Sequence, residues 1–258
     1  MKNDFIQKWV RERAIGNLKR ADNPLQRHPY EPSYLYETAI LPILHYAVQG
    51  VIWYQGESNA HNVETHEKLF TLLVNGWRKC WNNIDMPFFY VQLSSMDRPS
   101  WCWFRDSQRR LMKKVKHTGM VVCTDLGDSL DVHPRRKKEV GERLAHWALS
   151  QTYGKNMLCP SGPLYKNVTV NAGVAYVSFN YDEGLTTSDG KQVRTFEIAG
   201  ADQIYYPAHA LIENNYIKIW SEQVKNPQSV RYGWQPFTQA NLINRFGLPA
   251  STFQTLVP

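Results

Sequence analysis

The spacing of apolar residues changes near residue 160. Before that point, short apolar runs alternate with stretches in which apolar residues recur every three or four positions. Short apolar runs are typical of buried strands, and the longer spacing is typical of amphipathic helices. After it, apolar and polar residues alternate in short runs separated by Gly, Asn, Asp and Pro, which indicates antiparallel strands. The pattern predicts an α/β part followed by a β-rich part.

Strands and helices are predicted to alternate through residues 35 to 153. The apolar runs predict strands over 51–54, 86–95 and 119–128, and the helical spacing predicts helices over 35–47, 63–81, 104–116 and 134–153. Pro42 should interrupt the first of these helices. Such alternation predicts parallel βαβ units with right-handed crossovers. Residues 1–34 are expected to be irregular after a short opening helix.

A domain boundary is predicted at "LCPSGP", residues 158–163, where the pattern changes. We expect a first domain over residues 1–158 and a β-rich second domain over residues 159–258. The 258 residues, 43% of them hydrophobic, are enough for a sizeable core in either domain.

The charge distribution and the cysteine spacing argue against a nucleic-acid-binding protein, a zinc protein and a disulfide-stabilised protein. The net charge of +7 is spread along the chain apart from "MKKVK" at 112–116 and "RRKK" at 135–138, which argues against a nucleic-acid partner. The four cysteines show no CxxC spacing, so the sequence predicts buried free thiols and neither a zinc site nor a disulfide framework.

The N-terminal segment lacks the apolar core of a signal peptide, and no later run approaches the ~20 apolar residues of a membrane span. We therefore expect a soluble chain with no membrane partner. A leader that has been removed would not show in this sequence, so the compartment stays open, and a longer form could be periplasmic or secreted.

Two predicted strands end in polar groups: "QGESN" follows the strand at 51, and "DLGDSLDVHP" follows the strand at 119. The carboxyl ends of parallel strands lie at one edge of a sheet, where ligands bind. His133, with Asp131 or Asp128, would then face the first segment across a crevice. A histidine oriented by a carboxylate can remove the proton of a serine hydroxyl. The alternative is that His133 only neighbours a helix start beside Pro134.

The first segment offers further candidates. Gln55 could donate its amide N–H to an oxyanion, or it could simply close a turn. Glu57 would repel an oxyanion, so we interpret it as a buried hydrogen-bonding hub. Ser58 is a candidate nucleophile, although its surroundings lack the G-x-S-x-G elbow.

An aromatic segment, "SWCWF" at 100–104, is expected to form a loop that could wall a substrate pocket. Arg105 follows it. This arginine could bind a substrate carboxylate, or it could lie exposed on a helix face.

Several sequence blocks run from about Tyr34 to the C-terminus: "GVIWYQGESNA", "PFFYVQL", "DLGDSLDVHPRRKKEVGERLAHWAL", "GLTTSDGK", "FEIAGAD", "VKNPQSVRYGW" and "NLINRFGLPASTF". Together these blocks resemble the sialate O-acetylesterase family. The resemblance implies an SGNH-like three-layer α/β/α core, incomplete at its N-terminus, followed by an antiparallel β region. It also implies a carboxylic ester hydrolase that removes O-acetyl groups from sialic acid, with no metal and no organic cofactor.

The resemblance also assigns site residues. His133 matches the catalytic base, Gln55, Gly56 and Glu57 match a "QGE" block near the oxyanion, and Asp131 matches the acidic partner better than Asp128, which stays eligible. The family carries its nucleophile in an N-terminal "GQSN" block, and residues 1–50 contain no such block. The resemblance therefore implies a nucleophile outside this chain.

Because the "GQSN" block is missing, other partners and functions stay open. We expect the chain either to self-associate or to bind an N-terminal partner fragment. Two alternative functions remain: a catalytically silent, truncated or carbohydrate-binding protein, and an acetylesterase for xylan or pectin.

Overall fold

The computed structural model describes residues 7–155 and 158–256. The chain divides into two compact units, one of Met1–Val48 with Asn75–Ile84 and one of Gln49–Val74 with Asp85–Pro258. Each unit is described by itself.

The first unit is mainly helical. It contains α1 (Lys8–Leu18), a π-helical turn (Tyr36–Ile40), a 3-10 turn (Leu41–Ile43) and the end of α2 (Val63–Cys80). The indole Nε1 of Trp81 donates to the carbonyl oxygen of Tyr46 at 3.0 Å, which ties the end of α2 to the preceding segment. The interruption expected at Pro42 is present, because regular α-helix is replaced there by two short turns.

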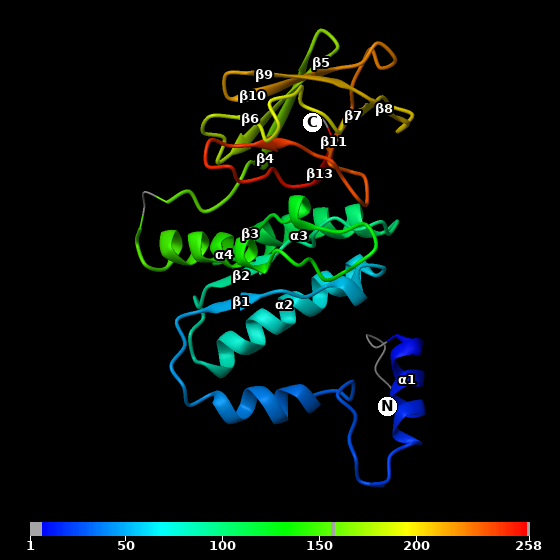
Figure 1. Ribbon diagram of the computed structural model, residues 1–258, viewed down its shortest axis with the longest axis vertical. Coiled ribbons are helices and arrows are strands. Elements are labelled where there is room, and N and C mark those ends of the chain that lie inside the picture. Colours follow the sequence, from blue (N-terminus) through cyan, green and yellow to red (C-terminus); the bar gives the residue numbers. More distant parts are fainter. Residues whose placement is uncertain (1–6, 156–157, 257–258) are drawn as a thin grey trace. The chain divides into compact units, whose positions relative to one another are not determined.

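The second unit begins with a parallel three-stranded sheet. Its strands are β1 (Val51–Trp53), β2 (Phe88–Val91) and β3 (Thr118–Val121), in the order β1-β2-β3. Both pairings are parallel, so all three carboxyl ends lie at one edge. Figure 1 shows these strands with α2, α3 (Trp101–Lys114) and α4 (Lys137–Gln151).

Alternating side chains of this sheet face different helices. Phe89 and Val91 of β2 pack in one cluster with Trp147 of α4. On the other face the Phe70 ring of α2 lies 5.8 Å from Phe88 and 5.0 Å from Tyr90, between ring centroids. The Tyr90 hydroxyl donates to the Gln108 carbonyl of α3 at 2.6 Å. The expected α/β/α layering is therefore confirmed.

The remainder of this unit is antiparallel β. One sheet has the order β4-β5-β10-β9, formed by Leu164–Asn171, Val174–Asn180, Tyr216–Trp220 and His209–Glu213. The other has the order β13-β11-β7-β8, formed by Phe253–Leu256, Ser229–Tyr232, Phe196–Ala199 and Tyr205–Pro207. A short pair joins β12 (Leu242–Ile243) to β6 (Thr186–Thr187).

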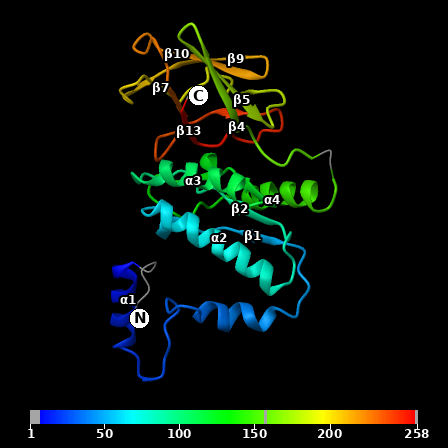
Figure 2. The same ribbon diagram turned by 180° about the vertical axis from the view of Figure 1, so that it is seen from behind.

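The two larger sheets share one apolar core. Val177 and Ile217 from the first sheet are fully buried in the same cluster as Ile198, Val230 and Phe253 from the second. Figure 2 shows these strands together at the C-terminal end of the chain. The β-rich, sandwich-like region expected after residue 159 is present, and its first strand starts at Leu164. The domain boundary at 158–163 stays a prediction, because the compact units divide the chain elsewhere.

The aromatic segment "SWCWF" corrects one sequence-based expectation. It is not a loop: α3 begins at Trp101, and Trp101 and Phe104 are buried on its inner side. The Trp101 indole Nε1 donates to the Ser94 carbonyl oxygen at 2.8 Å. The helix starts earlier than the apolar spacing suggested because these aromatic rings pack against the segment that follows β2.

Candidate active site

The loop after β1 is closed by its own side chains. The Gln55 amide Nε2 donates to Asn59 Oδ1, and the Asn59 backbone N–H donates to the Gly56 carbonyl at 2.8 Å. Residues Glu57–Asn59 form one 3-10 turn. Gln55 therefore closes a turn, which is the second of its two expected roles. Its amide has two N–H groups, and only one of them is used in the bond to Asn59.

Gly56 permits the shape of that loop. Its φ of +147° lies in a region that side chains rarely adopt, and a Cβ atom there would lie 2.6 Å from the Phe104 ring. The loop can therefore lie directly against α3 only with glycine at this position.

The loop after β3 positions His133. Asp128 Oδ1 accepts the backbone N–H groups of Leu130 at 2.8 Å and Asp131 at 3.2 Å, which shapes the turn. Asp131 Oδ1 accepts the His133 backbone N–H at 2.9 Å and its ring Nδ1 at 3.0 Å. Asp131 is thus the carboxylate that contacts the imidazole, and Asp128 supports the backbone around it.

The contact with Asp131 fixes the tautomer of His133. A carboxylate only accepts, so Nδ1 carries the proton and Nε2 is left as a base. The His133 side chain is 82% exposed, and Nε2 has no hydrogen bond within the described residues. The backbone and ring N–H groups of His133 lower the pKa of the Asp131 carboxyl. Asp131 therefore stays ionised beside the ring at neutral pH.

Residues flanking the two loops are in contact with each other. Val132, next to His133, and Tyr54, next to Gln55, both pack against one buried cluster that includes Ala60 and Leu93. Lys137 Nζ lies 4.5 Å from the centroid of the Tyr54 ring. The structure therefore brings the "QGESN" and "DLGDSLDVHP" segments together at the carboxyl edge of the sheet, as the order of strands predicts.

Two side chains of the first loop make no hydrogen bond within the described residues. Glu57 is half-buried, and its carboxylate makes no hydrogen bond within the described residues, so the interpretation as a buried hub is wrong. Ser58 is exposed on the 3-10 turn, with no base bonded to its hydroxyl among the described residues.

Arg105 has neither of its expected roles. It is fully buried, and its guanidinium donates to the carbonyls of Gly233 at 3.0 Å, Gln235 at 2.6 Å and Pro236 at 2.9 Å. Burial lowers its pKa to about 10. Arg105 is therefore a clamp between α3 and the loop after β11.

This clamp extends toward the site. Ser95 Oγ accepts one N–H of Arg105 at 3.3 Å, and the Met96 backbone N–H donates to the Pro236 carbonyl at 3.2 Å. The next N–H, of Asp97, donates to the Ser129 carbonyl in the His133 loop at 3.1 Å. The β-rich part thus supports the segment against which the His133 loop lies.

A second arginine holds the base of the same loop. Arg143 of α4 binds both carboxylate oxygens of Asp125, at 2.7 and 2.6 Å, and donates to the Val122 carbonyl at 2.6 Å. Sequence reasoning missed Arg143 and gave Arg105 other roles. For the Arg143–Asp125 pair the sequence gives a weak signal, because Arg143 lies on the first helix after β3. For Arg105, which binds backbone carbonyls, the sequence gives no signal.

The described part of the chain has free thiols but no clustered metal ligands. It contains no group of three or more His, Cys, Asp or Glu side chains arranged for a metal ion. All four cysteines are free thiols, of which Cys102 and Cys123 are buried. Within the same residues, every helix is too short or too polar to cross a membrane.

Comparison with known proteins assigns the chain to a family. A family model described as "Carbohydrate esterase, sialic acid-specific acetylesterase" matches residues 6–150. The chain belongs to this family. The resemblance found from the sequence blocks is therefore confirmed.

Similar proteins include mammalian sialate O-acetylesterases and one solved bacterial structure. The chain is 29% identical to the rat enzyme, over 80% of this chain and 43% of that one, and 30% identical to the mouse enzyme, over 66% and 36%. A carbohydrate acetylesterase from Xanthomonas citri superposes with a TM-score of 0.80 at 36% identity, over 86% of this chain and 53% of that one. The chain spans less than half the length of these curated relatives.

Proposed function

We propose that this chain supplies the base and the oxyanion side of a carbohydrate O-acetylesterase that acts on O-acetylated sialic acid. The observation that carries the proposal is the 3.0 Å contact between His133 Nδ1 and Asp131, in a loop whose Val132 packs on the same apolar cluster as Tyr54, the residue before the "QGESN" segment. The family and its sialate O-acetylesterase members support the same reaction.

The reaction follows from the free Nε2 of His133. A serine Oγ attacks the carbonyl carbon of the acetyl group while Nε2 takes the hydroxyl proton. The tetrahedral intermediate collapses, the C–O bond to the sugar breaks, and the imidazolium returns the proton to the sugar oxygen. Water then attacks the acetyl-enzyme by the same proton transfers, and acetate leaves. Asp131 stabilises the imidazolium and keeps the ring oriented.

The oxyanion needs hydrogen-bond donors that face it before the charge develops. The N–H of the Gln55 amide that is not bonded to Asn59 is one candidate, and the bond to Asn59 holds that amide in place. Gly56 contributes by letting the loop lie against Phe104. A carboxylate only accepts hydrogen bonds, so Glu57 is not proposed as an oxyanion donor.

The nucleophile is proposed to lie outside these 258 residues. No Gly-Gln-Ser-Asn block occurs in the printed sequence, and Ser58 is exposed on a turn without a bonded base. A serine supplied by a preceding segment or by another polypeptide would complete the site. This chemistry uses side chains and water throughout.

The test is acetate release from an O-acetylated sugar by the chain supplied with a Gly-Gln-Ser-Asn-bearing segment, comparing this completed wild type with its His133→Ala, Ser58→Ala and Asp128→Asn variants. His133→Ala should lower the rate by about 10³-fold or more, because the base acts as a unit with the serine. Ser58→Ala and Asp128→Asn should each retain most of the rate. A rate that is unchanged in His133→Ala would refute the proposed base.

A second candidate is a chain that binds acetylated sugar without turnover. It is favoured by the 82% exposure of the His133 side chain and by the lack of any serine bonded to it among the described residues. Saturable binding of O-acetylated sialic acid with no acetate release, in the presence of a serine-bearing segment, would select this candidate.

A further inference from the structure

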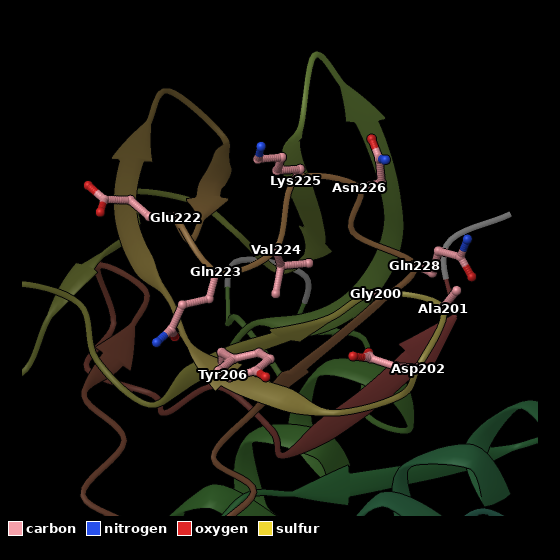
Figure 3. A pocket seen from close by; sticks show the side chains of 10 residues that line it. All are labelled: Gly200, Ala201, Asp202, Tyr206, Glu222, Gln223, Val224, Lys225, Asn226 and Gln228. Atoms are coloured by element: carbon pink, nitrogen blue, oxygen red, sulfur yellow. The ribbon is translucent and has the colours of Figure 1, made fainter.

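A second cleft lies in the β-rich part, formed by none of the residues of the two active-site loops. It has a volume of about 530 Å³, within the ~300–1,000 Å³ range of small-molecule sites. It is lined by the turn between β7 and β8, by Tyr206 of β8, and by the segment between β10 and β11. Figure 3 shows its lining side chains.

The backbone around this cleft is held by internal hydrogen bonds. Gln228 N–H donates to the Ala199 carbonyl at 2.8 Å, and Ile204 N–H donates to Asp202 Oδ1 at 3.1 Å. Val224 is 5% exposed and belongs to the core shared by the two sheets. The cleft is therefore a fixed feature of the fold whose floor is anchored in the core.

Three polar side chains of the cleft have no hydrogen-bond or ion-pair partner among the described residues and could therefore bind a ligand. Lys225, Asn226 and Gln223 are exposed and make no side-chain hydrogen bond or ion pair in the residues that the structure describes. Other charged side chains of the β-rich part form ion pairs: Arg231 pairs with Glu197 at 2.9 Å, and Lys218 pairs with Glu213 at 3.5 Å.

The arrangement of these groups indicates the ligand class. Figure 3 shows Asp202, Tyr206 and Val224 around the middle of the cleft, with Lys225 and Asn226 on the rim above them. Tyr206 is half-buried: it packs against the core shared by the two sheets and also lines the cleft, where its ring would offer an apolar surface for stacking. Amide groups both donate and accept, which suits ligands whose hydroxyl groups do the same.

Charge excludes a strongly anionic ligand. Lys225 and Asp202 carry opposite charges, and Glu222, which points outward in Figure 3, adds a further negative charge at the border. A phosphate or polyanionic ligand would need an excess of cations. We propose that this cleft binds a neutral, hydroxyl-rich glycan, in which a sugar ring stacks on Tyr206 and its hydroxyl groups bond Asp202, Lys225 and Asn226.

This proposal goes beyond the esterase reaction, because the cleft would hold a glycan chain rather than the acetyl group. Its test needs no turnover. Calorimetric titration of the 258-residue chain uses three probes: chitotetraose, cellotetraose and, as the anionic comparison, 3′-sialyllactose. One of the neutral tetrasaccharides should bind with a dissociation constant of about 0.1–5 mM, more tightly than sialyllactose.

Matched variants assign the binding to the cleft. Tyr206→Ala and Asn226→Ala should each weaken binding by about tenfold, equivalent to ~1.4 kcal/mol. Tyr216→Ala, whose ring packs on Tyr176 at 5.6 Å, and Asn167→Ala, an exposed position on β4, should leave it unchanged. Because Asn226 is exposed, Asn226→Ala tests the cleft even if Tyr206→Ala fails to fold.

Three results would overturn the proposal: no saturable binding of either neutral tetrasaccharide, equal binding by Asn226→Ala and wild type, or tighter binding of sialyllactose. His133→Ala should bind these glycans as wild type does. A failed esterase assay therefore leaves this proposal standing, and loss of glycan binding leaves the esterase proposal standing.

Discussion

At the scale of single residues, Gly56 is the position that most constrains the site. Its positive φ and its approach to Phe104 leave no room for a side chain. Gly56→Ala should lower the free energy of unfolding by about 2–4 kcal/mol, from backbone strain and overlap with the ring. Urea denaturation measures the change. Gly76→Ala in α2 is the control: a Cβ there meets no atom within 4 Å, and it should raise stability by up to ~1 kcal/mol. Equal effects of the two substitutions would contradict this account of the loop.

His66 makes the fold sensitive to acid. It is 5% exposed and its ring packs at a tilt against that of Phe104, with ring centroids 4.4 Å apart, and burial lowers its pKa to about 4. The unfolded chain binds this proton near pH 6.5, so stability is lost as the pH falls from about 6.5 toward 4, by up to ~3 kcal/mol. His66→Phe should remove this part of the pH dependence. Parallel stability-versus-pH curves for variant and wild type below pH 6.5 would show that His66 does not carry it.

At the scale of elements, the apolar pattern predicted the alternation of strands and helices and the change to antiparallel β. The pattern predicted the wrong end of an element where contacts with distant residues determine where that element begins. Trp101 starts α3 because its ring bonds the Ser94 carbonyl, and that contact has no local signature. The order of strands also predicted that His133 and Gln55 lie on loops at one edge. Which aspartate contacts His133 depends on the turn that Asp128 forms, and spacing alone left both eligible.

Arg105 gives the sharpest prediction about elements. Arg105→Met would leave the carbonyls of Gly233, Gln235 and Pro236 without their donor, and it should cost about 3 kcal/mol of stability. Arg110→Met removes a half-exposed guanidinium of the same helix, and its buried partner Asp106 keeps Arg109, so the substitution should cost less than Arg105→Met, about 1 kcal/mol. Thermal and urea unfolding measure both. If Arg105→Met were as stable as Arg110→Met, the clamp would not hold α3 to the β-rich part.

At the scale of the whole molecule, the parallel sheet ends at β1, an edge strand whose Ile52 is 66% exposed. Exposed edge strands favour association with another chain. We therefore expect concentration-dependent self-association in sedimentation velocity experiments, reduced in Ile52→Lys. A wild-type chain that stays monomeric at all concentrations would argue against an open edge.

The central claim is that His133 and the "QGESN" loop serve one acetyl group. The most direct measurement is acetate release from 9-O-acetylated sialic acid, with the chain alone and with a Gly-Gln-Ser-Asn-bearing segment of the family added before residue 1. The account predicts activity in the completed form, lost by about 10³-fold in His133→Ala, reduced in Asp131→Asn and kept in Asp128→Asn. A completed form that releases no acetate, or one that His133→Ala leaves fully active, would contradict the account.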